Sequence, residues 1–227
     1  MEIVTSASIG IALSTPALLT DETPVDAAVT LLRNAGIEPF TISPGVDEDA
    51  VAARAERMGL IAGTADMVHV LAKAKAEAVL NHTDAFGKLI IGCDSSLEFD
   101  GQSLGKPHDP EVARERWKQM RGRAGVLHSG HWVIDNRNPH EGVLPPAAGR
   151  TAHTIVHFAD LSDAEIDAYV ATREPLKVAG AFTIDSLGGA FIRAIEGDPH
   201  CVIGLSLPTL RDLVIQLGVD YTSLWNR

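Results

Sequence analysis

The sequence predicts an α/β fold built around a mixed sheet. Short apolar runs with the character of strands alternate along the chain with longer segments of helical periodicity. One run, residues 89–91, is uniformly apolar, as is typical of a strand buried on both faces of a sheet. The chain has 227 residues, 45% of them hydrophobic, which suffices for one sizeable core. We therefore expect a single domain over residues 1–227.

The first half of the chain predicts two further strands and two helices. Strands are expected over residues 2–5 and 40–43, and helices over residues 27–34 and 65–80. Pro44-Gly45 stops the second strand, and Gly36 follows the first helix as a C-terminal cap. Thr64 is a suitable N-cap for the alanine-rich second helix. Lys75 borders the apolar stripe of that helix, so its ammonium can extend from the apolar surface into polar surroundings.

The second half of the chain predicts a hairpin, three strands and three helices. Strands are expected over residues 126–135, 151–158 and 190–195, and the last helix over residues 208–217. Asp100-Gly101 marks the tight turn of the hairpin. Asp109-Pro110 begins a helix with a capping carboxylate and a proline at its first position. Ser162 and Glu165 form a capping box for a helix that Pro175 closes.

The composition argues against several classes of protein. The formal net charge of −11 is unlike that of a general nucleic-acid binder or of a protein bound to a membrane surface. Cys93 and Cys201 lie in apolar surroundings, which is typical of small buried residues in a reducing compartment. The N-terminus lacks the pattern of a signal peptide, and no apolar run is long enough for a membrane span. A cytoplasmic location is therefore expected.

The stretch 88–107 brings together residue types that bind phosphate esters through a metal. Asp94 follows the buried apolar run, and the carboxyl ends of strands are where ligands bind in open α/β sheets. An ionised carboxylate there needs a cation or hydrogen-bond donors to offset its burial. After the hairpin, Gly105-Lys106-Pro107 returns an ammonium on a restrained backbone. The alternative interpretation is a strand that ends in a solvated aspartate and leads into an ordinary hairpin.

Several short motifs around that stretch occur in a fixed order through most of the chain. They are Ser6-Ala7-Ser8, Val46-Asp47-Glu48, Lys75-Ala76, KLIIGCDSSLEFDGQSLGKP at 88–107, Gly122-Arg123, Ser129-Gly130, Glu174-Pro175-Leu176, Ala179-Gly180-Ala181-Phe182 and the segment 197–205. Together they resemble the motifs of the Maf family of nucleoside triphosphate pyrophosphatases. An ordered set of this kind is far more specific than any single motif.

The resemblance implies a curved mixed sheet with flanking helices, in two lobes around a central cleft. It also implies hydrolysis of nucleoside triphosphates to a nucleoside monophosphate and pyrophosphate, as house-cleaning of non-standard nucleotides. A divalent cation, Mg²⁺ or Mn²⁺, is expected as the cofactor, because carboxylates and waters are its usual ligands. Nucleoside triphosphates are the expected partners, and a homodimer is a possible assembly. No nucleic-acid polymer or membrane is expected to bind.

The resemblance also implies roles for individual residues. Asp94 and Glu48 are the expected metal ligands, with Asp94 alternatively the general base that activates water. Lys75 and Lys106 are the expected catalytic cations that hold phosphate. The expected substrate-binding residues are Ser6, Ser8, Ser95, Arg123 and Asp185.

Each of these assignments has a structural alternative in the sequence. Glu48 lies in an acidic run, Asp47-Glu48-Asp49, which is favoured at the start of a helix. A helical lysine such as Lys75 is usually solvated, and arginines such as Arg123 are common at helix ends. Asp185 lies beside a serine and could cap a turn. A histidine metal site is not favoured, since strand positions 153 and 157 are roughly 13 Å apart.

The chain departs from the Maf pattern near its N-terminus. The family motif runs S-x-S-P-R-R into a helix, but residues 9–30 form an atypical insertion with no Arg or Lys. This loss of a phosphate-binding arginine raises an alternative function, a weakened or inactive nucleotide-binding protein with a regulatory or interaction role. Asp185 occupies the place of a glutamine thought to read the base. Because a carboxylate only accepts hydrogen bonds, we expect cytosine and guanine nucleotides to be preferred over uracil and thymine ones.

Overall fold

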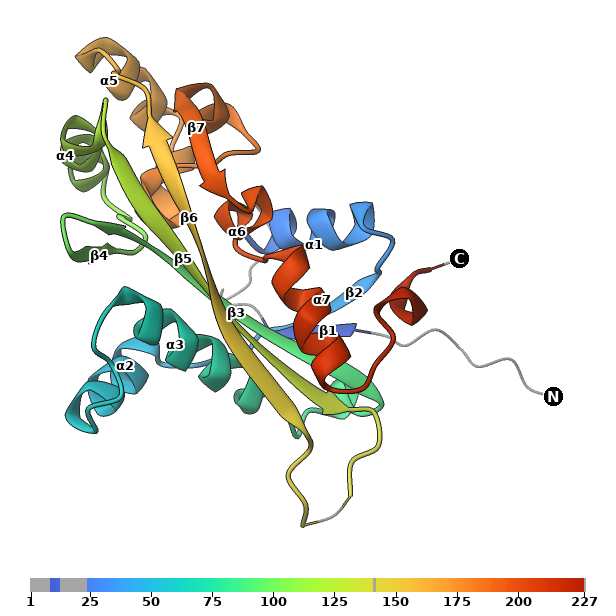
Figure 1. Cartoon of the computed structure of the whole chain (residues 1–227). Coiled ribbons are helices and arrows are strands. Elements are labelled where there is room, and N and C mark those ends of the chain that lie inside the picture. Colours follow the sequence, from blue (N-terminus) through green and yellow to red (C-terminus); the bar gives the residue numbers. More distant parts are fainter. Residues whose placement is uncertain (1–8, 13–23, 141, 227) are drawn as a thin grey trace.

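The computed structural model describes residues 9–12, 24–140 and 142–226. Its centre is a mixed seven-stranded sheet in the order β2-β1-β3-β5-β6-β7, with β4 paired to one end of β3 (Figure 1). The strands are β1 (Ile9–Ala12), β2 (Pro39–Ile42), β3 (Lys88–Phe99), β4 (Gln102–Leu104), β5 (Ala124–Asn136), β6 (Ala147–Phe158) and β7 (Ile192–Gly197). The expected α/β fold class is confirmed.

Helices cover both faces of this sheet. They are α1 (Pro24–Asn34), α2 (Glu48–Arg57), α3 (Thr64–Ala78), α4 (Pro110–Met120), α5 (Asp163–Ala171), α6 (Pro199–Ile203) and α7 (Leu207–Gln216). Short 3₁₀ segments are η1 (Thr83–Ala85), η2 (Glu174–Lys177), η3 (Ala179–Ala181), η4 (Leu187–Phe191) and η5 (Tyr221–Leu224). Asp109 caps α4 and the Ser162 capping box opens α5, both as predicted. The N-cap of α3 is Gly63, so the expected capping role of Thr64 is wrong.

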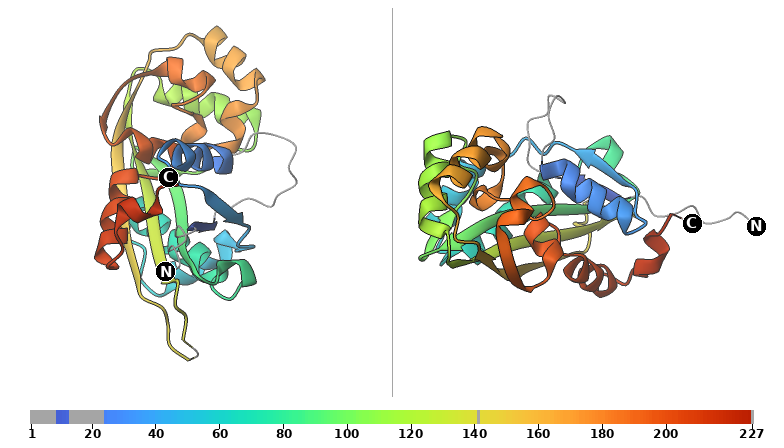
Figure 2. Two further views of the ribbon diagram at one scale, coloured as in Figure 1. Left: turned by 90° about the vertical axis from the view of Figure 1, so that its right-hand side faces the viewer. Right: turned by 90° about the horizontal axis from the view of Figure 1, so that it is seen from above.

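Two separate hydrophobic cores lie at opposite ends of one sheet face. Helices α1 and α7 pack on the first half of β3, where Leu89 and Ile91 are buried. Helices α4 and α5 pack on its second half, around Leu97 and Phe99. Figure 2 shows α4 and α5 together at one end of the molecule and α1 and α7 farther along it. The two lobes implied by the family resemblance thus correspond to two cores that share one long strand.

The parallel part of the sheet ends at Gly92. Strand β1 runs parallel to both β2 and β3, and its last residue pairs with Gly92. Strand β4 pairs antiparallel with β3 only from Leu97 onward. Within the described residues, the segment 93–96 of β3 therefore has a strand neighbour on one side only, namely β5.

The expectation that the buried strand ends before Asp94 is wrong. Strand β3 continues to Phe99, and Asp94 lies near its middle, opposite Gly130 of β5. The pairing of β3 with β1 ends at Gly92. The apolar run 89–91 therefore marks only the part of β3 that has a strand on both sides. Asp94 still lies where ligands bind in such sheets, at the carboxyl ends of the parallel strands.

Helix α3 lies unusually close to the other face of the sheet. A Cβ atom placed on Gly92 would come within 2.1 Å of the Ala72 carbonyl oxygen, and one placed on Gly130 within 2.3 Å of the Val68 carbonyl oxygen. Side chains at these two positions would separate helix and sheet. The close approach puts Lys75 of α3 directly beside β3.

The expected N-terminal strand over residues 2–5 and the serine motif at 6–8 lie outside the described residues. In the described part, β1 begins at Ile9 and pairs with β2 and β3, so the serines precede the first described strand. The described ends of the stretch 9–30 are β1 and the start of α1. These two ends of the expected insertion therefore belong to the regular sheet and its covering helices.

Across the described ranges of the chain, no helix is both long enough and apolar enough to span a bilayer.

The contact between α3 and Gly92 should be sensitive to a single methyl group. We expect Gly92→Ala to lower the free energy of unfolding by at least about 2 kcal/mol, because the new Cβ meets helix backbone that cannot rotate away. Denaturant titration measures this loss. Gly63→Ser is the control, since its Cβ meets nothing within 4 Å, and a change within about 0.5 kcal/mol is expected. Equal effects for the two variants would contradict the close packing.

Candidate active site

Three charged side chains meet where α2, α3 and β3 converge. The Lys75 ammonium donates a short hydrogen bond to Asp94 Oδ1, and its nitrogen lies 3.1 Å from Glu48 Oε1. The Lys75 side chain is fully buried, whereas those of Asp94 and Glu48 are 12% and 39% exposed. Lys75 extends into polar surroundings, as expected, but these are two carboxylates that meet its ammonium inside the protein.

Glu48 is held in place by the start of α2. Strand β2 ends at Ile42, and a short turn leads to Asp47, whose side chain caps the helix by accepting from the Ala50 N–H at 2.9 Å. Glu48 is the first helical residue, where a negative charge is favoured by the helix dipole. Both interpretations of the run Asp47-Glu48-Asp49, as a helix start and as the source of a functional carboxylate, are therefore compatible with the structure. The run begins a helix, and it also delivers a carboxylate to Lys75.

Burial and charge shift the titration of this cluster. Burial raises the pKa of Asp94 to about 6, although the Lys75 ammonium acts in the opposite direction. Burial also tends to lower the pKa of Lys75, but the carboxylates of Asp94 and Glu48 outweigh it, so that pKa is raised. Lys75 therefore stays charged, while Asp94 titrates close to neutral pH. A carboxylate poised in this way can accept a proton.

Lys106 belongs to the same group of charges. It follows the β3–β4 hairpin and is partly buried, which lowers its pKa, while Glu48 and Asp94 raise it less strongly. In the part of the chain that the structure describes, the Lys106 ammonium makes no hydrogen bond or ion pair. The structure thus brings together all four residues expected to be catalytic, with one ammonium left free of a partner among them.

Ser95 does not join this cluster. Successive residues of a strand point to opposite faces, so Ser95 points away from Asp94. Its hydroxyl lies 2.7 Å from Ser129 Oγ, which in turn donates to the Cys201 carbonyl at 2.8 Å. These bonds tie β3 to β5 and α6. Ser6 and Ser8, the other serines expected to bind substrate, lie outside the described residues.

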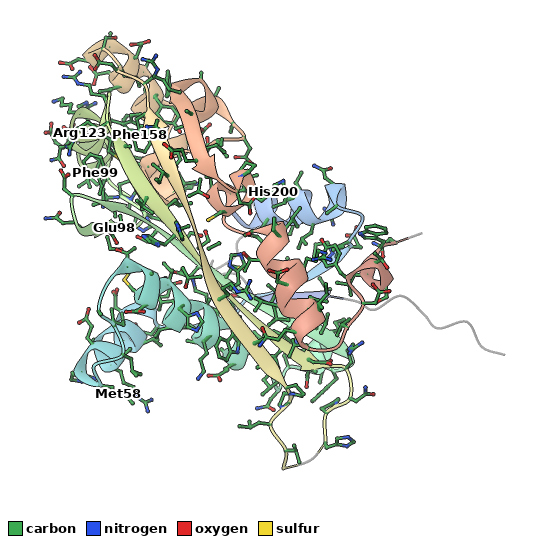
Figure 3. The ribbon with its side chains drawn as sticks, viewed as in Figure 1. Met58, Glu98, Phe99, Arg123, Phe158 and His200 are labelled. Carbon is green, nitrogen blue, oxygen red and sulfur yellow. The ribbon has the colours of Figure 1, made fainter. Side chains whose placement is uncertain are left out.

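Arg123 is also remote from the cluster. It directly precedes β5, seven positions before the partner of Asp94, which corresponds to roughly 20 Å of extended chain. Its guanidinium lies 2.6 Å from Asp100 and packs over the Phe99 ring. Figure 3 shows Arg123 beside Phe99 and Phe158, at the end of the sheet away from α2 and α3. The expected contact of Arg123 with substrate therefore stays a prediction, for a residue that the structure places apart from the charged cluster.

Asp185 is presented by a loop built around another carboxylate, that of Glu174. Glu174 accepts hydrogen bonds from Tyr169 OH, Thr183 Oγ1, Ser186 Oγ and the N–H groups of Leu187 and Gly188, at 2.6–3.1 Å. Asp185 itself is exposed and makes no hydrogen bond or ion pair with a described residue. The turn is therefore held by Glu174, and the side chain of Asp185 is not used to cap it.

The donors at the cluster fit a divalent cation that also binds substrate. Asp94 and Glu48 offer two carboxylates that both contact the Lys75 ammonium and both act on the charge of Lys106. Over the described residues, no group of three or more His, Cys, Asp or Glu side chains could hold a metal ion. Mg²⁺ commonly binds through one or two carboxylates and completes its shell with waters and substrate phosphates. Two carboxylates suit that mode and not a site built from protein ligands alone.

Comparisons with known proteins show which proteins this chain resembles. The model of a family described as Maf-like protein matches residues 29–217. A protein of Leifsonia xyli, named nucleoside triphosphate pyrophosphatase, is 56% identical over 203 residues, covering 88% of this chain and 93% of that protein. The chain belongs to the Maf family. Proteins of the same name from Streptomyces avermitilis and Mycobacterium marinum are 47% and 44% identical, covering 88% and 86% of this Maf chain and 90% of each relative.

Two contacts of this Maf protein were not anticipated from its sequence. The carboxylate of Glu174 organises the loop of Asp185, a role that the motif Glu174-Pro175-Leu176 does not indicate by itself. Arg116 of α4 donates to the Gly105 carbonyl at 2.5 Å, immediately before Lys106. In the sequence Arg116 is one of several charged residues on a polar helix. Only its proximity to the hairpin loop separates it from the others.

The buried ammonium should control the titration of Asp94. We expect Lys75→Met to raise the pKa of Asp94 above about 6 and to destabilise the protein by about 3 kcal/mol at pH 8. This loss of stability should shrink toward pH 5, because the Asp94 carboxyl of the folded variant is then protonated and no longer buries an unpaired negative charge. Carboxyl NMR and denaturant titration at several pH values measure both effects.

Lys73→Met provides the matched control for this prediction. Lys73 lies on the same helix but is half exposed, and its nitrogen is 3.8 Å from Glu77. We expect its loss to change stability by less than about 1 kcal/mol at every pH. A Lys75→Met variant that follows the Lys73→Met variant across pH would show that Lys75 does not stabilise an ionised Asp94.

Proposed function

We propose that this Maf protein hydrolyses nucleoside triphosphates to a nucleoside monophosphate and pyrophosphate. The observation that carries the proposal is the buried Lys75 held between Asp94 and Glu48, with the unpaired Lys106 beside them. Hydrolysis of a phosphoanhydride requires neutralisation of phosphate charge and activation of a water molecule. The names of the relatives support this activity and no other.

The residues of the cluster divide the chemistry between them. Lys75 donates to Asp94 Oδ1 and so leaves Oδ2 free to accept a proton from the attacking water. Lys106 is free to contact phosphate oxygens and to offset the charge that develops on the leaving pyrophosphate. A Mg²⁺ or Mn²⁺ ion held by Asp94 and Glu48 would supply further neutralisation of the phosphates. Asp94 must be ionised in either role, as base or as metal ligand.

The alternative of an inactive nucleotide-binding relative is less well supported. A protein that only bound nucleotides would need cations, but it would not need a carboxylate whose pKa lies near neutrality. The fully buried Lys75 would also be costly to retain without a function for its two carboxylates. The absence of Arg and Lys from residues 9–30 remains the one feature that favours weak activity.

A product assay tests the proposal directly. The protein is incubated with a panel of standard and modified nucleoside triphosphates, with Mg²⁺, with Mn²⁺ and with a chelator. We expect release of pyrophosphate and nucleoside monophosphate, dependence on the metal, and faster turnover of some modified nucleotides, as a house-cleaning role in the cytoplasm requires. Release of phosphate and a nucleoside diphosphate would point to a different bond cleavage. Absence of turnover over the whole panel would overturn the proposal.

Asp94 should be essential for this activity. Asp94→Asn keeps the shape of the side chain and removes its charge, so we expect kcat to fall by at least about 10²-fold. Asp84→Asn, at an exposed aspartate of η1, is the control and should retain wild-type turnover. Thermal melting checks that both variants fold. Turnover of Asp94→Asn within a few-fold of wild type would remove Asp94 from the mechanism.

The pH dependence of kcat/KM should reflect the raised pKa of Asp94. The carboxyl is protonated below about pH 6, so kcat/KM should fall about tenfold per pH unit there and level off above. The profile is measured well below saturating metal, because a bound cation favours the ionised form and moves the acid limb lower. A profile that stays flat between pH 5 and 7 under these conditions would contradict the role of Asp94.

The choice of base should depend on Asp185. Its exposed carboxylate can accept hydrogen bonds from the amino groups of cytosine or guanine, but it would face the carbonyl edges of uracil and thymine. We therefore expect kcat/KM for CTP and GTP to exceed that for UTP and dTTP, and Asp185→Gln to reduce the difference. Lys177→Gln, at an exposed position on η2 near the same loop, is the control. An unchanged ranking in Asp185→Gln would exclude base reading by Asp185.

A further inference from the structure

Arg116 is a half-buried cation without a carboxylate partner. In the described part of the chain its one hydrogen bond goes from Nη1 to the carbonyl oxygen of Gly105, at 2.5 Å. The other basic residues of α4 are paired, Arg114 with Glu111 and Asp167, and Lys118 with Glu115. In a chain with a net charge of −11, carboxylates are abundant. The lack of one at Arg116 therefore sets it apart from its neighbours on the helix.

Burial of this guanidinium is unfavourable in the free protein. Removal of a charge from water costs free energy unless a counter-charge or hydrogen-bond acceptors replace the water. Burial lowers the pKa of Arg116, although a guanidinium retains its charge in proteins. One of its five N–H groups is used by Gly105, and the rest are available to a ligand. The planar arrangement of these donors matches the oxygens of a phosphate.

The position of Arg116 links it to the proposed active site. Gly105 directly precedes Lys106, whose ammonium is likewise partly buried and unpaired among the described residues. Lys106 in turn lies close enough to Glu48 and Asp94 for their charges to act on its titration. Two cations that are unpaired among the described residues are thus associated with one hairpin loop, Lys106 within it and Arg116 in contact with its Gly105 carbonyl.

We propose that Arg116 and Lys106 together bind the phosphate chain of the substrate, and that Arg116 provides the guanidinium missing from residues 9–30. The proposal rests on the proposed function, since it assigns a substrate contact at the same site. It explains how an acidic protein without an arginine in its N-terminal stretch can hold a polyphosphate. Arg116 reaches this site from α4, which follows the Lys106 loop in the chain.

The other group of exposed cations fits this role less well. A shallow depression lined by Arg123, His157 and Arg193 lies at the far end of the sheet. Arg123 is paired with Asp100, and His157 lies 2.7 Å from Glu196, so only Arg193 keeps its charge unmatched there. The residues that line that depression include no lysine and no half-buried guanidinium like that of Arg116. Arg193 therefore serves as a matched control for Arg116.

Binding of inorganic pyrophosphate, with Mg²⁺ present, tests the proposal without reliance on turnover. Titration calorimetry compares the wild type with Arg116→Met, which keeps the apolar stem, and with Arg116→Lys, which keeps a point charge. We expect Arg116→Met to weaken pyrophosphate binding about 10- to 100-fold and Arg116→Lys to weaken it less. Arg193→Met should leave binding within about twofold of wild type. Thermal melting confirms that each variant folds, and Arg116→Gln replaces Arg116→Met if it does not.

A second comparison separates direct binding from mere support of the loop. If Arg116 only positioned Lys106, its loss would have no further effect once Lys106 was removed. We expect Lys106→Ala/Arg116→Met to bind pyrophosphate at least about tenfold more weakly than Lys106→Ala alone. An Arg116→Met loss below about tenfold, or no further loss in the double variant, would overturn the proposal. The two proposals can fail separately. If the Arg116 variants bind pyrophosphate normally but the wild type hydrolyses triphosphates, only the role of Arg116 is overturned. If the wild type hydrolyses no triphosphate, the binding measurement still decides whether Arg116 contacts pyrophosphate.

Discussion

The arrangement of this site depends on one buried ammonium. Lys75 is fully excluded from solvent, and a charge in that position is tolerated only because Asp94 and Glu48 both meet it. These three residues come from a helix, a strand and the first turn of a second helix. Their contact therefore fixes α2 and α3 against β3. The same contact keeps the carboxylates close together, which they would otherwise resist through like-charge repulsion.

The ammonium can reach the carboxylates because helix and sheet are in direct backbone contact. Gly92 and Gly130, neighbours of Asp94 along and across the sheet, leave room for the α3 backbone. Just beyond Gly92 the pairing with β1 ends, while β4 has not yet begun. Among the described residues, a carboxylate at this place has a strand neighbour on one side only. Asp94 and Glu48 remain 12% and 39% exposed, so the buried charge of Lys75 is combined with carboxylates that keep some exposure.

Charge distribution explains how an acidic protein can act on a polyphosphate. Arg114 and Lys118 of α4 are paired with carboxylates, whereas Lys106 and Arg116 are not paired within the described residues. Both are partly removed from water, which strengthens their attraction to an anion. The carboxylates of Asp94 and Glu48 act on the titration of Lys106, and a divalent cation held by these two carboxylates would add further positive charge. Local positive charge therefore replaces the overall positive charge that the protein lacks.

The sequence by itself determined the local features of this protein. Caps, turns and alternation depend on residues close together in the chain, so the α/β class, the Asp109 cap and the hairpin after Asp94 could be predicted. Contacts between distant segments could not. Only the packing of α3 on two glycines decided that Lys75 is buried between carboxylates, and only the length of β5 placed Arg123 far from them. The position of Arg116 beside Gly105 was likewise decided by tertiary structure, since the docking of a helix on a loop leaves no local pattern in the sequence.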